Sequence, residues 1–492
     1  MLGLLVGGLV ALGPTPSVAQ QVPVAVRGPD PTLTRDLDAL MAQAPPDTCL
    51  RVSVDGVAAY DHRGSDLQSP ASTEKVLTAG AVLDGLGPDH RLRTEVVAAA
   101  PPVGGIVEGD VTLVGGGDPV LVTEAYRAYR GIGDDRPHTS LDALADALRE
   151  AGVTEIRGRL LVDDGRYDAE RRVPSWPPRI TADDPDPLGA LVVDDGWVLD
   201  RRDGAVERRR PGDPAVAAGD ALRWLLALRG VRVGSDEVGR GSRPAGGVVL
   251  AGVDSPPVDA LVTEMLLRSD NHIAEQLLKE LGVVTEGRGE TAAGARAVAA
   301  WTARVGAATP GSRVVDGSGL DPTNATSCQG LVAALDAVGP EGTVGQGLPV
   351  AGRSGTLAGR FASTAAAGRL RAKTGTLDDV RALAGFVELP EGATATFAFV
   401  ANGQVGARTL AIEAFLAQLL ATWLPPCPEG DPAPIDAPLS APAVLVPIAP
   451  GPWGAAAAPG LVTALVALEG PATAPLDRCA RASRPPVALG TG

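Results

Sequence analysis

The sequence contains very little lysine. Of its 43 basic residues, three are lysine (Lys75, Lys279 and Lys373) and the other forty are arginine. Because arginine supplies almost all of the basic residues, we expect each remaining lysine to lie where an arginine could not perform the same function. A guanidinium does not give up its proton in a protein, whereas a buried lysine can become a neutral amine. Each of the three lysines is therefore a candidate for such a role.

Other absences argue against several classes of protein. With a net charge of −16 and no stripe of basic and aromatic residues, nucleic acid is not an expected partner. The four histidines are scattered, no H-E-x-x-H or G-x-S-x-G motif occurs, and the wide spacing of the four cysteines matches no zinc motif. We therefore expect no metal and no cofactor, and neither a zinc peptidase nor an α/β-hydrolase.

The N-terminus carries an apolar run that is too short to span a bilayer, which takes roughly twenty apolar residues. It is followed by proline, small residues and "SVAQ", a pattern typical of a secretory signal peptide, which we place at residues 1–19. The sequence thus predicts an exported protein, located in the cell envelope (periplasm or cell wall) or secreted, with no stable membrane span.

Four cysteines in an exported chain predict two disulfides. We favour Cys49 with Cys328 and Cys427 with Cys479, although the sequence does not choose among the three possible pairings.

A chain of 492 residues is expected to form two or three domains. Residues 48–63 predict two strands around an Asp55-Gly56 turn, and a helix that carries Ser72 follows. We assign residues 31–94 to the first part of one domain.

From residue 95 to residue 256 the chain changes to short β-rich runs with predicted helices at 140–151 and 217–229. We interpret 95–256 (called the inserted segment below) as one or two inserted domains of unknown role. Residues 257–425 return to the first domain, beginning with two helices over 257–282 that meet at "SDN". Three antiparallel strands and a helix at 407–424 follow. Residues 426–492 form a Pro/Ala-rich C-terminal extension.

The motif S-x-x-K places Ser72 three residues before Lys75. A serine hydroxyl needs a base within hydrogen-bond reach, and residues three apart on a helix have Cβ atoms about 5 to 6 Å apart. An isolated S-x-x-K is more often a capped helix with a surface lysine. Here, however, "SDN" at 269–271 and "KTG" at 373–375 complete, in order, the set found in class A β-lactamases and penicillin-binding proteins. Two of the three lysines lie in these motifs.

Three residues are predicted to be catalytic: Ser72, Lys75 and Ser269. Ser72 is the nucleophile, and its N–H, with that of Thr376, would stabilise an oxyanion. Lys75 must be neutral to act as the base, a state that burial and a second cation such as Lys373 favour. Ser269 would relay a proton to the leaving amine.

The predicted substrate-binding residues are Asn271, Lys373, Thr374, Gly375 and Thr376. Asn271 would hold a substrate amide. A cation at Lys373 and the hydroxyls of Thr374 and Thr376 suit recognition of a terminal carboxylate.

With these motifs the chain resembles the penicillin-binding proteins, and more narrowly the low-molecular-mass class C group. These are D-alanyl-D-alanine carboxypeptidases and endopeptidases with domains inserted after the nucleophile. The long gap between Ser72 and Ser269 fits that group, whereas the gap is short in class A β-lactamases. The resemblance covers about residues 45–425 and includes further segments at 113–121, 187–196, 314–327 and 348–387. Ser354 and Asp321 stand where the family has Asp and Ser.

The resemblance implies an α/β (α+β) fold of the DD-peptidase/β-lactamase type. A five-stranded antiparallel sheet would form from the first hairpin and the last three strands, covered by terminal helices, and a helical subdomain would carry Ser72. It also implies acylation of Ser72 by a peptidoglycan stem peptide ending in D-Ala-D-Ala, release of D-Ala, hydrolysis of the acyl-enzyme, and inhibition by β-lactams.

Two alternatives stay open. A serine β-lactamase shares the acylation chemistry and differs in fast deacylation. A non-catalytic cell-wall scaffold would bind glycan or protein through the inserted segment, and the intact motif residues argue against it. No dedicated deacylating carboxylate stands out, so our hypothesis is that Lys75 acts a second time.

Overall fold

The computed structural model describes residues 30–177, 187–202, 205–424, 445–446 and 464–465. The chain divides into two compact units, one of residues 28–425 and one of residues 1–27 with 426–492. The predicted signal peptide, Cys427 and Cys479 lie outside the described residues. Of the second unit, only the paired strands β20 (Leu445–Val446) and β21 (Ala464–Leu465) are described.

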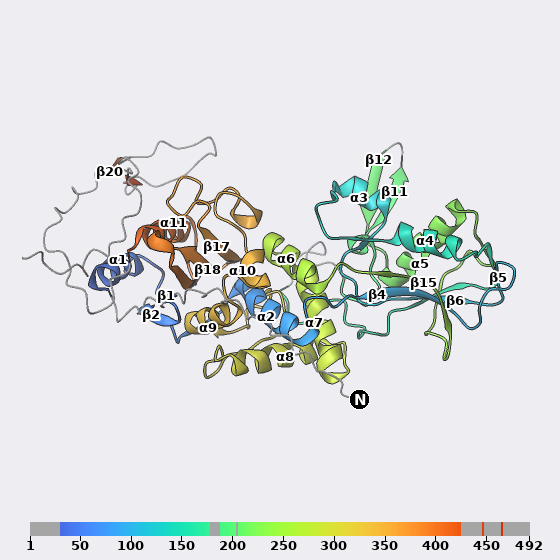
Figure 1. Ribbon diagram of the computed structural model, residues 1–492, viewed down its shortest axis with the longest axis horizontal. Helices are drawn as coiled ribbons and strands as arrows, with labels where there is room; N and C mark the ends of the chain where they lie inside the picture. The colour runs from blue at the N-terminus through green and yellow to red at the C-terminus, as the bar shows by residue number, and fades with distance from the viewer. Residues whose placement is uncertain (1–29, 178–186, 203–204, 425–444, 447–463, 466–492) are drawn as a thin grey trace, which may run out of the picture. The chain divides into compact units, whose positions relative to one another are not determined.

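A five-stranded antiparallel sheet forms from segments at opposite ends of the first unit, in the order β17-β18-β19-β1-β2 (Figure 1). Its strands are β1 (Asp47–Val54), β2 (Val57–His62), β17 (Leu370–Leu377), β18 (Val380–Glu388) and β19 (Thr394–Asn402). This is the sheet that the resemblance to the penicillin-binding proteins implies.

The hairpin turn and the terminal helices of this sheet are also as predicted. Asp55 and Gly56 both have positive φ, 50° and 76°, as a two-residue type I′ turn requires. The helices α1 (Pro31–Met41) and α11 (Ala407–Thr422) pack against each other and against β2 and β18, respectively.

A helical part of the same unit carries Ser72, the predicted nucleophile. Its central helix, α2 (Glu74–Leu86), is buried over residues 74–82, as expected for a helix surrounded by others. One turn of 3₁₀ helix, η1 (Ala71–Thr73), leads into it. The other helices of this part are α6 (Val258–Arg268), α7 (Asn271–Glu286), α8 (Thr291–Arg304), α9 (Cys328–Val338) and α10 (Thr343–Gly347).

The inserted segment has its own sheet, in the order β14-β10-β6-β4-β15, and its own hydrophobic core. Its predicted helices are present as α4 (Leu141–Glu150) and α5 (Pro214–Leu228). The strands of the sheet are β4 (Arg93–Ala98), β6 (Val111–Val114), β10 (Leu160–Asp163), β14 (Gly239–Arg240) and β15 (Val248–Asp254).

Several short elements complete the first unit. In the inserted segment they are β5 (Ile106–Val107), β7 (Leu121–Val122), α3 (Glu124–Arg130), β8 (Thr139–Ser140), β9 (Glu155–Ile156), η2 (Asp194–Gly196), β11 (Val198–Arg202), β12 (Ala205–Arg209) and β13 (Arg232–Val233). Outside it they are β3 (Leu67–Gln68), β16 (Thr326–Ser327), η3 (Gly355–Leu357) and η4 (Pro390–Gly392). No helix among the described residues is long and apolar enough to cross a membrane.

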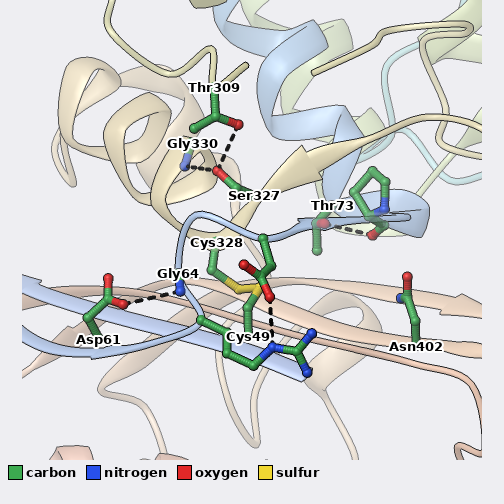
Figure 2. The surroundings of a disulfide bond; sticks show 12 residues. Cys49, Asp61, Gly64, Thr73, Thr309, Ser327, Cys328, Gly330 and Asn402 are labelled. Carbon is green, nitrogen blue, oxygen red and sulfur yellow. Dashed lines mark hydrogen bonds and ion pairs between the residues drawn. A yellow bond between two sulfur atoms is a disulfide. The ribbon is translucent and has the colours of Figure 1, made fainter. Parts of the chain in front are cut away.

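A disulfide joins the sheet to the helical part. Cys49 on β1 is bonded to Cys328, the first residue of α9, as favoured from the sequence (Figure 2). The two residues are 279 positions apart, so the bond links the two chain segments on either side of the inserted segment.

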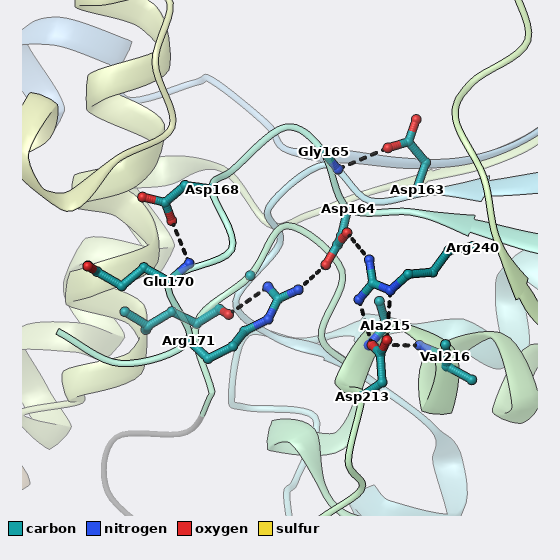
Figure 3. A network of polar contacts seen from close by, with 12 residues as sticks. Asp163, Asp164, Gly165, Asp168, Glu170, Arg171, Asp213, Ala215, Val216 and Arg240 are labelled. Atoms are coloured by element: carbon teal, nitrogen blue, oxygen red, sulfur yellow. Dashed lines mark hydrogen bonds and ion pairs between the residues drawn. The ribbon is translucent and has the colours of Figure 1, made fainter. Parts of the chain in front are cut away.

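A polar network holds together the part of the inserted segment that follows β10 (Figure 3). The carboxylate of Asp164 accepts hydrogen bonds from Arg171 and Arg240, and Arg240 also donates to both oxygens of Asp213, the residue that caps α5. The network fixes the chain around Asp168, which lies between Asp164 and Arg171.

This part of the inserted segment contacts α7 through buried polar groups. Lys279 Nζ donates to Asp168 Oδ1 at 2.7 Å. Glu280 accepts from Arg166 at 2.8 Å and from the hydroxyl of Tyr167 at 3.1 Å. Because α7 begins at Asn271 of the SDN motif, the inserted segment contacts the helix that carries a predicted site residue.

Candidate active site

Ser72 and Lys75 lie together at the start of α2. Ser72 belongs to the 3₁₀ turn and Lys75 to the first turn of the helix, and Lys75 Nζ lies 3.1 Å from Ser72 Oγ. Ala71, directly before the nucleophile, has a φ of 47°, a strained conformation of the kind that clusters at functional sites. The local geometry brings the serine within hydrogen-bond reach of a lysine amine.

Lys75 is fully buried and also contacts Asn271 and Ser318. Its Nζ donates to Asn271 Oδ1 at 2.7 Å and to the carbonyl oxygen of Ser318 at 2.6 Å. Together with Ser72 these acceptors match the three donors of an ammonium group. The sequence predicts neither the contact with Asn271 nor a role for Ser318.

Ser269 and Lys373 form the second pair of the site. Lys373 Nζ donates to Ser269 Oγ at 2.7 Å and to the carbonyl oxygen of Thr374 at 2.9 Å. Ser269 has a φ of 62° at the end of α6, another strained non-glycine position. The structure therefore brings together the S-x-x-K, SDN and KTG motifs.

Burial and the positive charge of Lys75 hold the pKa of Lys373 well below its usual range. From the sequence, Lys373 is predicted to be a cation that suits recognition of a terminal carboxylate. The low pKa of Lys373, together with its 2.7 Å contact to Ser269 Oγ, favours a lysine that exchanges a proton with Ser269 over a permanently charged one.

The KTG strand lies against the nucleophile turn. A Cβ atom at Gly375 would lie 2.8 Å from the carbonyl oxygen of Pro70 and 3.2 Å from Cβ of Ala71, so this close approach needs a glycine. The hydroxyl of Thr374 donates to Thr356 Oγ1 at 3.0 Å.

Arg381 is a cation of the site that the sequence analysis missed. It lies opposite Thr376 in the β17–β18 hairpin, and its Nη1 donates to Thr376 Oγ1 at 2.7 Å. An arginine stays charged at all relevant pH values. In a hairpin with a two-residue turn, the residue five positions after Thr376 lies opposite it, so the sequence could have predicted this neighbour.

Three buried carboxyl groups, those of Glu74, Glu275 and Asp316, lie near Lys75. Glu275 accepts the backbone N–H groups of Gly317 and Ser318 at 3.0 and 2.8 Å, and burial, with the nearby Asp316, raises its pKa to about 8. Burial raises the pKa of Glu74 well above its usual range, and neither of its carboxyl oxygens has a hydrogen-bond partner among the described residues. None of the three groups was singled out from the sequence.

A cavity of about 430 Å³ adjoins the SDN motif. One side is formed by residues 264 and 268–273 at the junction of α6 and α7, and the inserted segment supplies the rest, including Val120, Trp197 and Arg208. The inserted segment thus borders the candidate site. Among the described residues, no group of three or more His, Cys, Asp or Glu is placed to hold a metal ion.

Comparisons with known proteins agree with this geometry. A model of the D-Ala-D-Ala carboxypeptidase 3 (S13) family matches residues 33–205 and 195–423. The chain is 32% identical over 488 residues to a D-alanyl-D-alanine carboxypeptidase of Actinomadura sp. (strain R39), with 81% of this chain and 86% of that protein covered. It is 34% identical over 430 residues to carboxypeptidase DacB of Mycolicibacterium smegmatis, with 82% and 88% covered.

A solved structure shows the same fold. The crystal structure of penicillin binding protein 4 (dacB) from Haemophilus influenzae superimposes with a TM-score of 0.67 at 21% identity, covering 79% of this chain and 100% of that one. The chain therefore belongs to the D-Ala-D-Ala carboxypeptidase 3 (S13) family, serine peptidases of the penicillin-binding-protein type that its three motifs resemble.

Proposed function

We propose that this chain removes the terminal D-alanine from peptidoglycan stem peptides ending in D-Ala-D-Ala, through an acyl-enzyme at Ser72. The observation that carries the proposal is the 3.1 Å contact between Lys75 Nζ and Ser72 Oγ, with the Ser269–Lys373 pair beside it. β-Lactams would acylate the same serine. Cleavage of cross-linked peptides is a second activity of the same chemistry.

Acylation begins when Lys75, as the neutral amine, takes the proton of Ser72. The oxygen Oγ bonds to the carbonyl carbon of the scissile amide, and the displaced electron pair moves to the carbonyl oxygen. The N–H groups of Ser72 and Thr376 stabilise that oxyanion. When the intermediate collapses, the C–N bond breaks and the leaving amine takes, through Ser269, the proton that Lys75 removed from Ser72. This step leaves Lys75 neutral again, and Lys373, with its lowered pKa, supports Ser269.

Deacylation returns the enzyme to its starting state. Water attacks the ester carbonyl, Lys75 takes the proton from the water, and Ser72 regains its own proton as the ester bond breaks. The overall reaction consumes one peptide and one water molecule and gives a shortened peptide and D-alanine.

Substrate binding falls to the SDN and KTG motifs. Asn271 holds a substrate amide, and Thr374, Gly375 and Thr376 line the strand edge against which the substrate lies. Lys373 and Arg381 are the two basic groups near the terminal carboxylate, and Arg381 carries the permanent charge.

The proposal extends to the organisation and location of the protein. Residues 31–94 and 257–425 form the catalytic domain, residues 95–256 are the inserted material, and residues 426–492 are an extension. Residues 1–19 direct export, so that the enzyme meets peptidoglycan in the cell envelope or outside the cell.

The experiment incubates the purified protein with benzylpenicillin, measures the intact mass, and then follows D-alanine release from a D-Ala-D-Ala peptide. A persistent one-to-one adduct together with D-alanine release is the expected result. Rapid turnover of penicillin without a lasting adduct would identify a β-lactamase, and no adduct with no release would identify a scaffold.

Two variants serve as controls. Ser72→Ala removes the acylated oxygen and should form no adduct. Lys75→Arg keeps a cation at this position but cannot accept a proton, so acylation should slow by roughly 10²- to 10⁴-fold. Normal acylation of Lys75→Arg would rule out Lys75 as the base.

A further inference from the structure

The carbonyl group of Ser318 is part of the environment of the catalytic lysine. It accepts a hydrogen bond from Lys75 Nζ at 2.6 Å, which is shorter than the contacts of that amine with Asn271 Oδ1 and Ser72 Oγ. Ser318 lies in the loop "DGSGLD" at 316–321, which is neither helix nor strand. Its carbonyl is therefore placed by side chains that hold the loop.

Asp316 is the main side chain that holds this loop. Its carboxylate is fully buried and accepts four N–H groups, which fills the acceptor positions of its two oxygens. Oδ1 accepts from the backbone of Gly319 at 2.9 Å and the side chain of Asn324 at 2.7 Å. Oδ2 accepts from the backbone of Asp321 at 2.7 Å and from the indole N–H of Trp176 at 2.7 Å.

Trp176 is the one donor of the four that comes from the inserted segment. It is buried and packs with Val173 and Leu188, and Leu320 of the loop packs against this cluster. The inserted segment therefore holds the loop twice, by a hydrogen bond to Asp316 and by an apolar contact with Leu320.

Only an ionised carboxylate can accept four N–H groups, because a protonated one loses an acceptor position to its own O–H. Burial raises the pKa of Asp316, and the hydrogen bond from Trp176 is the strongest influence that opposes it. Without that indole, the loop loses a donor and its buried charge loses support.

We propose that Trp176 is a positioning residue for the catalytic lysine: it acts through Asp316 on the loop that presents the Ser318 carbonyl to Lys75. The inserted segment then completes the catalytic site as well as bordering the cavity beside it. The proposal rests on acylation at Ser72, the function proposed above.

The test compares Trp176→Phe with wild type in acylation by benzylpenicillin, resolved into the dissociation constant of the initial complex and the acylation rate constant. The rate is expressed per penicillin-titratable site, so that misfolded molecules do not contribute. We expect the rate constant to fall roughly ten- to a hundredfold, as a displaced catalytic group would cause, with the dissociation constant within about twofold.

Trp301→Phe is the matched control. Trp301 is also buried, and its indole donates no hydrogen bond within the described part of the chain. The same substitution there should leave the acylation rate constant close to that of wild type. A purely structural role for Trp176 would lower the number of titratable sites and not the rate at each site.

Two more variants, Asp316→Asn and the double variant Trp176→Phe/Asp316→Asn, test whether Trp176 affects acylation through Asp316. If Trp176 acts through Asp316, Asp316→Asn alone lowers the acylation rate constant. Adding Trp176→Phe to that variant then lowers the rate constant little further. An unchanged rate constant in Trp176→Phe, or losses that multiply in the double variant, would overturn the inference. If wild type itself forms no adduct, the proposed function fails and the inference fails with it.

Discussion

The ammonium of Lys279 lies 2.7 Å from Asp168 Oδ1 and joins α7 to the inserted segment. Lys279 has no accessible surface, and the same is true of Lys75 and Lys373. All three lysines of this chain are therefore buried, and the amine of each donates hydrogen bonds to oxygen atoms. The scarcity of lysine singled out two groups of the candidate site, Lys75 and Lys373, and one group, Lys279, that links α7 to the inserted segment.

Removing Asp168 should destabilise the protein more than removing Lys279. In Asp168→Ala the buried ammonium has no carboxylate partner, and breaking a buried pair in this way costs up to about 3 to 5 kcal/mol. Asp168 is 31% exposed, so water reduces the cost toward the lower end of that range. Lys279→Met leaves a carboxylate that water can reach, and a smaller loss is expected.

Urea unfolding of both variants measures this difference. Asp36→Ala, which removes an exposed ion pair with Arg35, is the control and should change the free energy of unfolding by less than about 1 kcal/mol. A larger loss in Lys279→Met than in Asp168→Ala would contradict the interpretation.

Arg381 should matter for ligands that carry a carboxylate. Arg381→Gln removes a permanent charge beside Thr376 but can still donate a hydrogen bond to its hydroxyl. Acylation by benzylpenicillin should become about tenfold less efficient, since a charged hydrogen bond is lost. Acylation by the penicillin methyl ester, which has no carboxylate, should change little. Equal losses for both ligands would show that Arg381 supports the strand and does not bind the carboxylate.

Stability should depend on pH through Glu275. Its pKa of about 8 in the folded protein is above the ordinary value of 4.5, so the folded state binds this proton more tightly than the unfolded state does. The free energy of unfolding should therefore fall as pH rises from about 4.5 to about 8, with a slope of up to about 1.4 kcal/mol per pH unit.

Glu275→Gln isolates this contribution. The glutamine oxygen can still accept the two backbone N–H groups, and the nearby Glu74, Lys75 and Asp316 are the same in both proteins. Urea unfolding at pH 5 and pH 7.5 should show a smaller pH dependence in the variant. The same dependence in both proteins would mean that Glu275 does not titrate in this interval.

Short-range patterns predicted individual helices, strands and turns and the motif residues of the site, whereas the family resemblance predicted how these elements assemble. The Asp55-Gly56 turn, the helices on both sides of the SDN motif and the three late strands each follow from turn chemistry or periodicity within a few residues. The register of the last hairpin places Thr376 opposite Arg381, so the sequence also contained the signal for this missed cation.

The remaining features depend on how distant segments meet. The contact from Trp176 to Asp316 spans 140 positions and that from Lys75 to Ser318 spans 243, and no local pattern encodes either. The partner of Lys279 could not be read from the sequence for the same reason. Every residue has a backbone carbonyl group, so the residue type at position 318 does not indicate that its carbonyl accepts a hydrogen bond from Lys75.

The pairing of β1 with β19 joins Asp47 to Asn402, near the two ends of the first compact unit, residues 28–425. A ribosome therefore releases the serine and its helix long before it makes the strand that pairs with β1, and Lys373 also comes late. No nascent chain that ends before this point can assemble the nucleophile, the proton relay and the sheet. We therefore expect hydrolysis at Ser72 only from chains that have been synthesised through residue 402, where β19 ends.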